Sequence, residues 1–262
     1  MPDSLNILEL ENLEKTFDNG HRALVGLSLA VPAGSIFGFI GLNGAGKTTT
    51  IRIIAGLTAG DSGSVRIGGR SLAGGDRDYL ARVGFVLDEP LYFDWMAARE
   101  YLAWVGRMYG LRDSESDQRT AELLDFFDLP PADSQPIRQF STGMKKKVSL
   151  AAAIIHKPDL IILDEPLEGI DALAANAIKE TLTLMASRGS SVFITSHVLD
   201  TVERFCSEVA ILHQGRLVLQ CPTGEIRQRA GTVLNRENGG SLEELFVGLV
   251  AGSKKRKPLS YV

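Results

Sequence analysis

The sequence predicts an α/β protein with a mostly parallel sheet, and three observations lead to this class. Short apolar runs of strand length alternate with longer stretches whose apolar residues recur at helical spacing. Some runs, such as Leu160–Leu163, are apolar at every position, which is typical of strands buried on both faces of a sheet. A glycine-rich loop also joins one such strand directly to a helix. Strands that alternate with helices favour a parallel sheet.

The individual elements follow from the period of the apolar residues. Residues 5–32 alternate between apolar and polar side chains on both sides of a turn at 18–20 (Asp-Asn-Gly), which predicts antiparallel strands. In chain order we then expect a strand at 36–40, a helix over 48–57, strands at 65–67 and 83–87, a helical block over 91–129, a helix over 142–156, a strand at Leu160–Leu163, a helix over Ala172–Ser187, a strand at 192–195, a helix over 199–206 and a strand at 209–212.

Composition and charge exclude several classes of protein. The chain has 262 residues and a formal net charge of −4, with 44% hydrophobic and 23% charged residues, as expected of a globular protein. No apolar run approaches the roughly 18 residues of a membrane-spanning helix, and the N-terminus lacks the basic start of a secretory signal. The acidic balance disfavours nucleic acid as a partner. Cys206 and Cys221 are expected to be reduced.

The loop at residues 41–48 has the sequence GLNGAGKT, which matches the phosphate-binding pattern G-x-x-x-x-G-K-[ST]. It follows an apolar strand and opens a helix, which is the context that such a loop requires. Glycines let backbone N–H groups approach phosphate oxygens, and the N-terminus of the helix favours an anion. Lys47 is therefore expected to bridge the terminal phosphates of a nucleotide, and Thr48 to offer its hydroxyl to Mg²⁺.

Two adjacent carboxylates, Asp164 and Glu165, follow the strand Leu160–Leu163 directly. Ligands bind at the carboxyl ends of the strands in open α/β sheets, so both side chains are expected near the phosphate loop. Neighbouring side chains of a strand point in opposite directions, which allows them different roles. We expect Asp164 to hold Mg²⁺ and Glu165 to polarise a water for attack on the γ-phosphate. The alternative is an ordinary surface turn.

A third motif lies at residues 139–147 (QFSTGMKKK), where a loop enters an apolar helix. Ser141 is a predicted N-cap, and Gly143 permits close approach to the backbone. Two interpretations remain open from this motif alone. The serine and the basic residues form a second anion site at a helix N-terminus, or they belong to a capped helix with a solvated run of lysines.

The order of these motifs resembles that of ATP-binding cassette (ABC) ATPase subunits, over residues 5 to about 225. The segments NGAGKTTTIR, STGMKKK and SLEELF are similar to the ABC-2 exporter branch. The resemblance implies a P-loop NTPase (RecA-like) core with an N-terminal antiparallel β subdomain and an inserted α-helical subdomain. The implied division is an ATPase domain at 1–235, with antiparallel parts at about 5–35 and 63–70 and a helical lobe at about 91–147, and then a C-terminal helix and basic tail at 236–262.

The resemblance also implies a role for single positions. Catalysis would depend on Glu165, on His197 as the switch histidine and on Lys47, and the metal ligands would be Thr48, Asp164 and Asp88. ATP would be bound by Phe17 on the adenine, by Gly41, Asn43, Gly44, Ala45, Gly46, Lys47, Thr48 and Thr49, by Ser141 and Gly143 across a dimer, and by Asp171 in the D-loop. Taken singly, Phe17 and His197 are as compatible with core packing or a solvated loop as with contact to the nucleotide.

The sequence departs from the family pattern at several positions. Asp88 stands where the family has the glutamine of the Q-loop, and it adds a negative charge near the phosphates. Thr142 and Met144 replace a glycine and a glutamine of the signature. Ala172 replaces a frequent proline, and Glu168 lies just before the glycine of the D-loop. We expect these changes to affect the rate of ATP hydrolysis and its coupling to transport more than the binding of the nucleotide.

The leading hypothesis is a Mg²⁺-dependent ATPase subunit of an exporter, which dimerises on Mg-ATP and drives a separately encoded transmembrane permease subunit. Its expected location is cytoplasmic, peripheral on the inner face of the cell membrane. Aromatic residues of the lobe are candidates for the docking surface and are equally compatible with the lobe's own core. The basic residues 254–257 either contact anionic lipid or form a solvated tail. The aromatic candidates are Tyr92, Phe93, Trp95 and Trp104.

Two other functions remain open. One is a nucleotide switch that dimerises on ATP to regulate a soluble partner, which tandem cassettes or a long coiled-coil insertion would favour. The other is a hydrolytically weak half of a heterodimer, which Asp88 and Thr142 suggest and Glu165 and His197 oppose. The sequence does not identify the exported compound, because in such systems the membrane subunit selects it.

Overall fold

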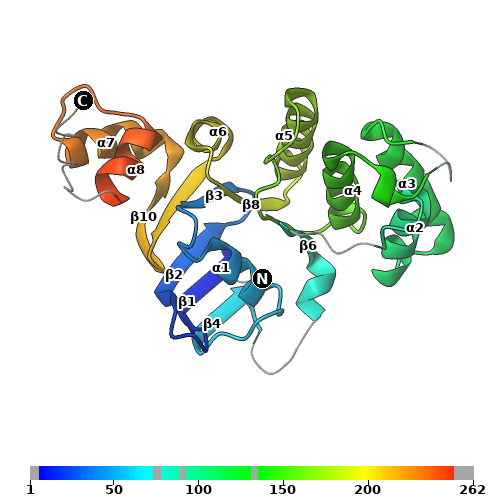
Figure 1. Ribbon diagram of the computed structural model, residues 1–262, viewed down its shortest axis with the longest axis horizontal. Helices are drawn as coiled ribbons and strands as arrows, with labels where there is room; N and C mark the ends of the chain where they lie inside the picture. Colours follow the sequence, from blue (N-terminus) through cyan, green and yellow to red (C-terminus); the bar gives the residue numbers. More distant parts are fainter. Residues whose placement is uncertain (1–5, 73–77, 89–92, 131–134, 251–262) are drawn as a thin grey trace, which may run out of the picture.

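The computed structural model describes residues 6–72, 78–88, 93–130 and 135–250. Within these ranges the chain forms two sheets, with helices along one face of the larger sheet and at both ends of the molecule (Figure 1). Among the described helices, none is both long enough and apolar enough to cross a membrane.

The smaller sheet is antiparallel and contains the N-terminal strands, as the sequence predicts. Its strand order is β2-β1-β4-β5 within the described residues. The turn at 18–20 joins the first two strands, and the N–H of Gly20 donates to the carbonyl of Phe17 at 2.8 Å. The strands are β1 (Asn6–Thr16), β2 (Arg22–Pro32), β4 (Ser62–Ile67) and β5 (Arg70–Ser71).

The larger sheet has the order β10-β9-β3-β8-β7-β6, and its pairs from β9 to β6 are all parallel. Its central strands are buried at every position, which explains their continuous apolar sequences. The last strand, β10, pairs antiparallel with β9. The strands are β3 (Ile36–Gly41), β6 (Val83–Val86), β7 (Leu160–Leu163), β8 (Ser191–Ser196), β9 (Glu208–His213) and β10 (Arg216–Pro222).

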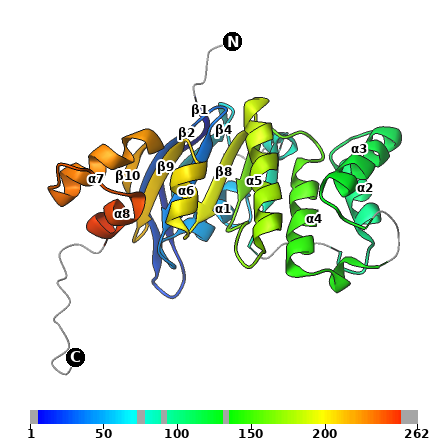
Figure 2. The same cartoon turned by 90° about the horizontal axis from the view of Figure 1, so that it is seen from above.

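The helices divide into one that packs between the sheets and several that cover the far face of the larger sheet. Figures 1 and 2 show α4, α5 and α6 side by side over that face, with α2 and α3 at one end of the molecule and α7 and α8 at the other. The helices are α1 (Lys47–Ile54), α2 (Ala98–Met108), α3 (Asp113–Phe126), α4 (Thr142–Ile154), α5 (Ala172–Ser187), α6 (Leu199–Phe205), α7 (Ile226–Leu234) and α8 (Leu242–Val250).

Two apolar cores hold these layers together, and the alternation of side chains along β3 separates them. Phe37 and Phe39 pack towards the smaller sheet and α1. Ile36 and Ile40 belong to the other core, which includes the covering helices and α2. Alternate residues of β3 therefore pack into both cores. This packing fixes the position of the loop that follows β3.

One helix ends earlier than the sequence predicts, and two elements of the structure were not predicted. The helix expected over 48–57 ends at Ile54, because Gly56 has a φ of +69° soon afterwards. Strand β10 was not predicted; it follows a tight turn in which Gln214 and Gly215 both have positive φ. Helix α7 was also not predicted, although its apolar residues recur at helical spacing; Gly231 in its interior disfavours a helix. The basic residues 254–257 and Tyr92 lie outside the described residues.

Candidate active site

The glycine-rich loop runs from the end of β3 into α1, and the two glycines at its ends are required by close packing. A Cβ on Gly46 would lie 2.5 Å from the carbonyl oxygen of Ala23, and Gly46 also has a φ of +113°. A Cβ on Gly41 would lie 2.6 Å from a backbone oxygen. Lys47 is 7% exposed, and its ammonium donates to the Gly41 carbonyl at 2.8 Å. The loop thus encloses a buried cation at the N-terminus of a helix.

Asp164 lies at the carboxyl end of β7, the central strand that follows α4, and is 3% exposed. The Thr195 hydroxyl, from the adjacent strand β8, donates to Asp164 Oδ1 at 2.6 Å. The backbone N–H of Glu165 donates to the same hydroxyl oxygen at 2.9 Å. Asp164 Oδ2 is buried and has no hydrogen-bond partner among the described residues. One oxygen of this carboxylate is therefore fixed, and the other remains available as a ligand.

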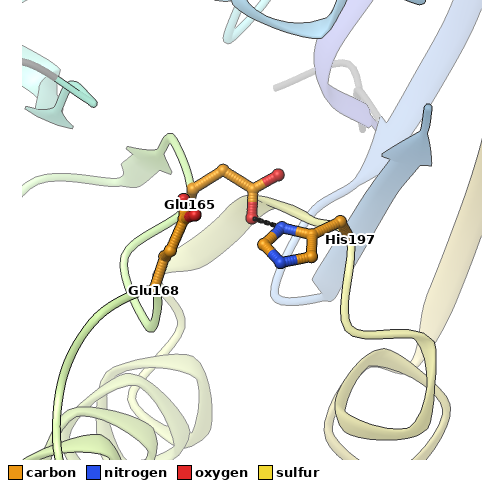
Figure 3. A group of neighbouring side chains, drawn as sticks. All are labelled: Glu165, Glu168 and His197. Atoms are coloured by element: carbon orange, nitrogen blue, oxygen red, sulfur yellow. Dashed lines mark hydrogen bonds and ion pairs between the residues drawn. The ribbon is translucent and has the colours of Figure 1, made fainter. Parts of the chain in front are cut away.

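Glu165 brings a second carboxylate to the same place, with its backbone in the left-handed region at a φ of +46°. Its Oε1 lies 3.7 Å from the Lys47 ammonium, and its Oε2 lies 3.0 Å from Nδ1 of His197 (Figure 3). His197 follows β8 and is half exposed, whereas Glu165 is 13% exposed. The carboxylate is therefore held between a buried ammonium and an imidazole, an arrangement suited to a base that acts on water.

These groups line one open cavity of about 900 Å³ at the carboxyl ends of the strands. The cavity brings together most of the residues proposed for ATP. Phe17 lies at its rim, 39% exposed, with the Lys15 ammonium 5.7 Å from the ring centroid. The predicted residues that line it are Phe17, Gly41, Asn43, Gly44, Gly46, Lys47, Thr48, Thr49, Asp88, Asp164, Glu165 and His197. Ala45 lies in the same loop, buried, and its carbonyl accepts from Gly215 N–H.

Three oxygen-bearing residues of this cavity fit a magnesium ion. Thr48, Asp88 and Asp164 also line a smaller adjoining cavity of about 300 Å³. Mg²⁺ prefers hydroxyl, carboxylate and water oxygens, and Asp164 Oδ2 is a buried oxygen without a partner among the described residues. A divalent cation would give Asp164 Oδ2 a partner. The oxygen atoms of Thr48, Asp88 and Asp164 therefore suit the predicted Mg²⁺.

Ser141, Gly143 and Asp171 do not line this cavity. Ser141 is exposed at the N-terminus of α4, where its hydroxyl accepts from the N–H of Met144 at 3.2 Å, which confirms the predicted N-cap. Asp171 caps α5 in the same way, and the N–H of Ala174 lowers the pKa of its carboxyl. A Cβ on Gly143 would lie 3.7 Å from Asp171 Oδ2. The two helix N-termini therefore form a separate surface.

Several residues at the site were not singled out from the sequence. Thr195 directly precedes the Ser196-His197 pair, near the carboxyl end of β8. Because ligands bind at the carboxyl ends of such strands, this place in the sequence could have indicated that Thr195 belongs to the site. Lys146 reaches the turn after β7 from α4. Phe246 lines the cavity from α8, and no local pattern connects it with the phosphate loop.

We expect Thr195→Val to destabilise the protein, because the change keeps the shape of the side chain and removes the hydroxyl that links Asp164 and Glu165. A buried carboxylate oxygen and a backbone N–H would lose their partner, at a cost of about 1–3 kcal/mol. Thermal unfolding should show a Tm several degrees below that of the wild type. Thr183→Val is the matched control, since its exposed hydroxyl bonds, among the residues that the structure describes, only a carbonyl of its own helix. Equal Tm values for both variants would contradict this role.

The fold and the site together define the class of protein. A phosphate loop between a buried strand and a helix, with a buried aspartate at the end of a neighbouring parallel strand, is the arrangement of a P-loop NTPase. The comparisons with known proteins agree with this class. The family model for the ABC transporter matches residues 24–168.

Similar proteins extend the match over most of the chain. The linearmycin resistance ATP-binding protein LnrL of Bacillus subtilis (strain 168) is 35% identical over 246 residues, which is 93% of this chain and 78% of LnrL. The lantibiotic transport ATP-binding protein SrtF of Streptococcus pyogenes is 30% identical over 253 residues, 95% of this chain and 100% of SrtF. A solved ATP-binding subunit of an ABC transporter is 34% identical, with a TM-score of 0.84, over 93% of this chain and 99% of that one.

The chain belongs to the ABC transporter family. Within it, the protein is an ATPase subunit of an ABC exporter, which confirms the family resemblance, the fold class and the activity expected from the sequence.

Proposed function

We propose that two copies of this chain close around two Mg-ATP molecules and drive a separately encoded membrane subunit. The observation that carries this proposal is that the site is divided. The cavity holds the phosphate loop, both carboxylates and His197, while Ser141 and Gly143 lie outside it on an exposed helix N-terminus. A second copy would supply that N-terminus to the γ-phosphate. Binding would then close the dimer, and hydrolysis would reopen it.

Binding of ATP uses the loop and the rim of the cavity. The backbone N–H groups of residues 41–48 surround the phosphates, and Lys47 turns from the Gly41 carbonyl to the terminal phosphates. Phe17 stacks on the adenine from the rim. Thr48 and Asp164 would hold Mg²⁺, and Asp88 would accept from water bound to it; the ion would supply positive charge to offset that of the phosphates.

Glu165 acts as the base for the attacking water. Its carboxylate is held by Lys47 on one oxygen and by His197 on the other, so it is oriented before ATP binds. His197 is half exposed and faces the cavity, where it would contact the γ-phosphate. An imidazole at this point reports whether the phosphate is present, because its charge and hydrogen bonds change with its neighbour.

The membrane subunit would dock on the helical lobe at 91–147, beside the ATPase core. Phe93, Trp95 and Trp104 are 39%, 63% and 38% exposed, which favours a docking surface over the interior of the lobe. A groove of about 460 Å³ opens beside them between α2 and β6. Such a partner would keep the protein on the inner face of the cell membrane. The names of the relatives concern linearmycin resistance and lantibiotic transport, and the membrane subunit would choose the compound exported here.

The test is to purify the chain from its native membranes in mild detergent and to measure ATPase activity of the bound and free forms. We expect a membrane protein to co-purify and to change the rate of Mg-ATP hydrolysis. Activity that is unaffected by membrane fractions, together with recovery of a soluble partner, would instead support the nucleotide-switch alternative.

A further inference from the structure

The lysine run at the start of α4 contacts two different parts of the molecule. The ammonium of Lys147 donates to the carbonyl of Phe127 at the end of α3, at 2.8 Å. The ammonium of Lys146 points the other way, to the turn that follows β7. Consecutive helix residues project about 100° apart, so neighbouring lysines reach different neighbours. Lys146 therefore connects the helix that carries Ser141 with the segment that carries Glu165.

The contact is made to the backbone of the turn. Lys146 Nζ donates to the carbonyl of Glu165 at 3.0 Å and also to the carbonyl of Glu168. The N–H of Glu168 donates to the same Glu165 carbonyl at 3.2 Å, which closes the turn. Glu165 has a φ of +46°, a conformation that non-glycine residues adopt only when their surroundings enforce it. The ammonium bonds the carbonyl of the residue that has this conformation.

The charges around Lys146 support the same contact. Burial lowers the pKa of the Lys146 ammonium, and the negative charges of Glu168, Asp88 and Glu165 act in the opposite direction. Asp88 and Glu168 are both departures from the family pattern and add carboxylates beside the phosphate site. Carboxyl oxygens of Glu165 and Glu168 lie within 4.8 Å of each other and of the His197 imidazole (Figure 3). A cation among these groups offsets their mutual repulsion.

We propose that Lys146 is a positioning residue for hydrolysis, which holds the turn 165–168 against α4 so that the Glu165 carboxylate stays between Lys47 and His197. This inference rests on the proposed role of Glu165 as the base. Lys146 contacts carbonyl oxygens of the turn and, among the described residues, bonds none of the phosphate loop at 41–48, so it affects the rate of hydrolysis and not the affinity for ATP. It also ties Ser141, at the start of α4, to the catalytic glutamate of the same copy.

The test compares Lys146→Met, Lys146→Arg and the control Lys179→Met in steady-state ATPase assays of the full chain. Lys179, on α5, is also partly buried, and its ammonium has no hydrogen bond or ion pair among the described residues. We expect Lys146→Met to lower kcat about tenfold or more, since small displacements of catalytic groups are costly. KM and the Kd for Mg-ATP should stay within about twofold of wild type, because binding groups are unchanged. Arginine should restore most of kcat, since it also donates to two acceptors.

Three results would overturn the inference: a wild-type kcat in Lys146→Met, an equal loss in Lys179→Met, or a loss of ATP affinity that accompanies a lower Tm. Wild type and Glu165→Gln are assayed in parallel to separate this inference from the proposed function. If wild type hydrolyses ATP and Glu165→Gln does not, the proposed function stands, and a normal rate in Lys146→Met rejects the role of Lys146 alone. Hydrolysis by Glu165→Gln rejects the proposed base itself.

Discussion

Glu165→Gln is expected to abolish ATP turnover while leaving ATP bound. The amide keeps the size of the side chain, but it is a far weaker base than the carboxylate that lies 3.7 Å from the Lys47 ammonium and 3.0 Å from His197 Nδ1. General-base catalysis contributes about 10²–10⁴-fold, so kcat should fall by at least about a hundredfold. The loop residues that bind phosphate do not change, and the Kd for ATP should remain near that of the wild type.

The measurement is phosphate release under steady-state conditions, with nucleotide binding measured separately. Glu180→Gln provides a matched control, because this exposed glutamate on α5 bonds, within the described part of the chain, only Asn176 one helical turn away. The control should hydrolyse ATP at the wild-type rate. Turnover by Glu165→Gln at that same rate would remove Glu165 from the catalytic step.

Lys47→Ala is expected to lose tight ATP binding. Lys47 is 7% exposed, and among the described residues no other lysine or arginine lines the cavity. A charge-assisted hydrogen bond contributes about 1.5–3 kcal/mol, so the Kd should rise about ten- to a hundredfold or more. The change also removes the ion pair with Glu165, which should lower kcat as well. Titration calorimetry with Mg-ATP measures the affinity.

Lys179→Ala serves as the control for this titration, since it removes a lysine from α5 and leaves the cavity intact. Its affinity for ATP should match that of the wild type. An unchanged Kd in Lys47→Ala would contradict the assignment of residues 41–48 as the phosphate loop.

Local patterns predicted the elements whose burial is uniform or follows a clear period, and missed β10 and α7. The continuous apolar runs of β3 and β7 identify them as central strands, because both of their faces are covered. Strand β10 lies at the sheet edge with several half-exposed residues, so its sequence has no clear period. Helix α7 has apolar residues at helical spacing, but it is short and has Gly231 in its interior, a residue that disfavours helices.

Some residues of the site could be predicted from contiguous motifs, whereas others depend on contacts between segments that are distant in sequence. The phosphate loop and the Asp164-Glu165 pair are contiguous motifs whose chemistry can be predicted from residue type and order. The bridge by Thr195 depends on the register between β7 and β8, which pairs strands that are distant in sequence. The Lys146 contact depends on how α4 packs against the turn after β7, and a run of three lysines does not indicate which of them faces it.

The central claim is that each complete site needs two copies of the chain, and the mass of Glu165→Gln in solution tests it most directly. Light scattering coupled to size exclusion, with Mg-ATP present, should give twice the monomer mass, and the isolated peak should contain one ATP per chain. Without nucleotide, the same variant should elute as a monomer. A monomer that carries ATP would contradict the shared site.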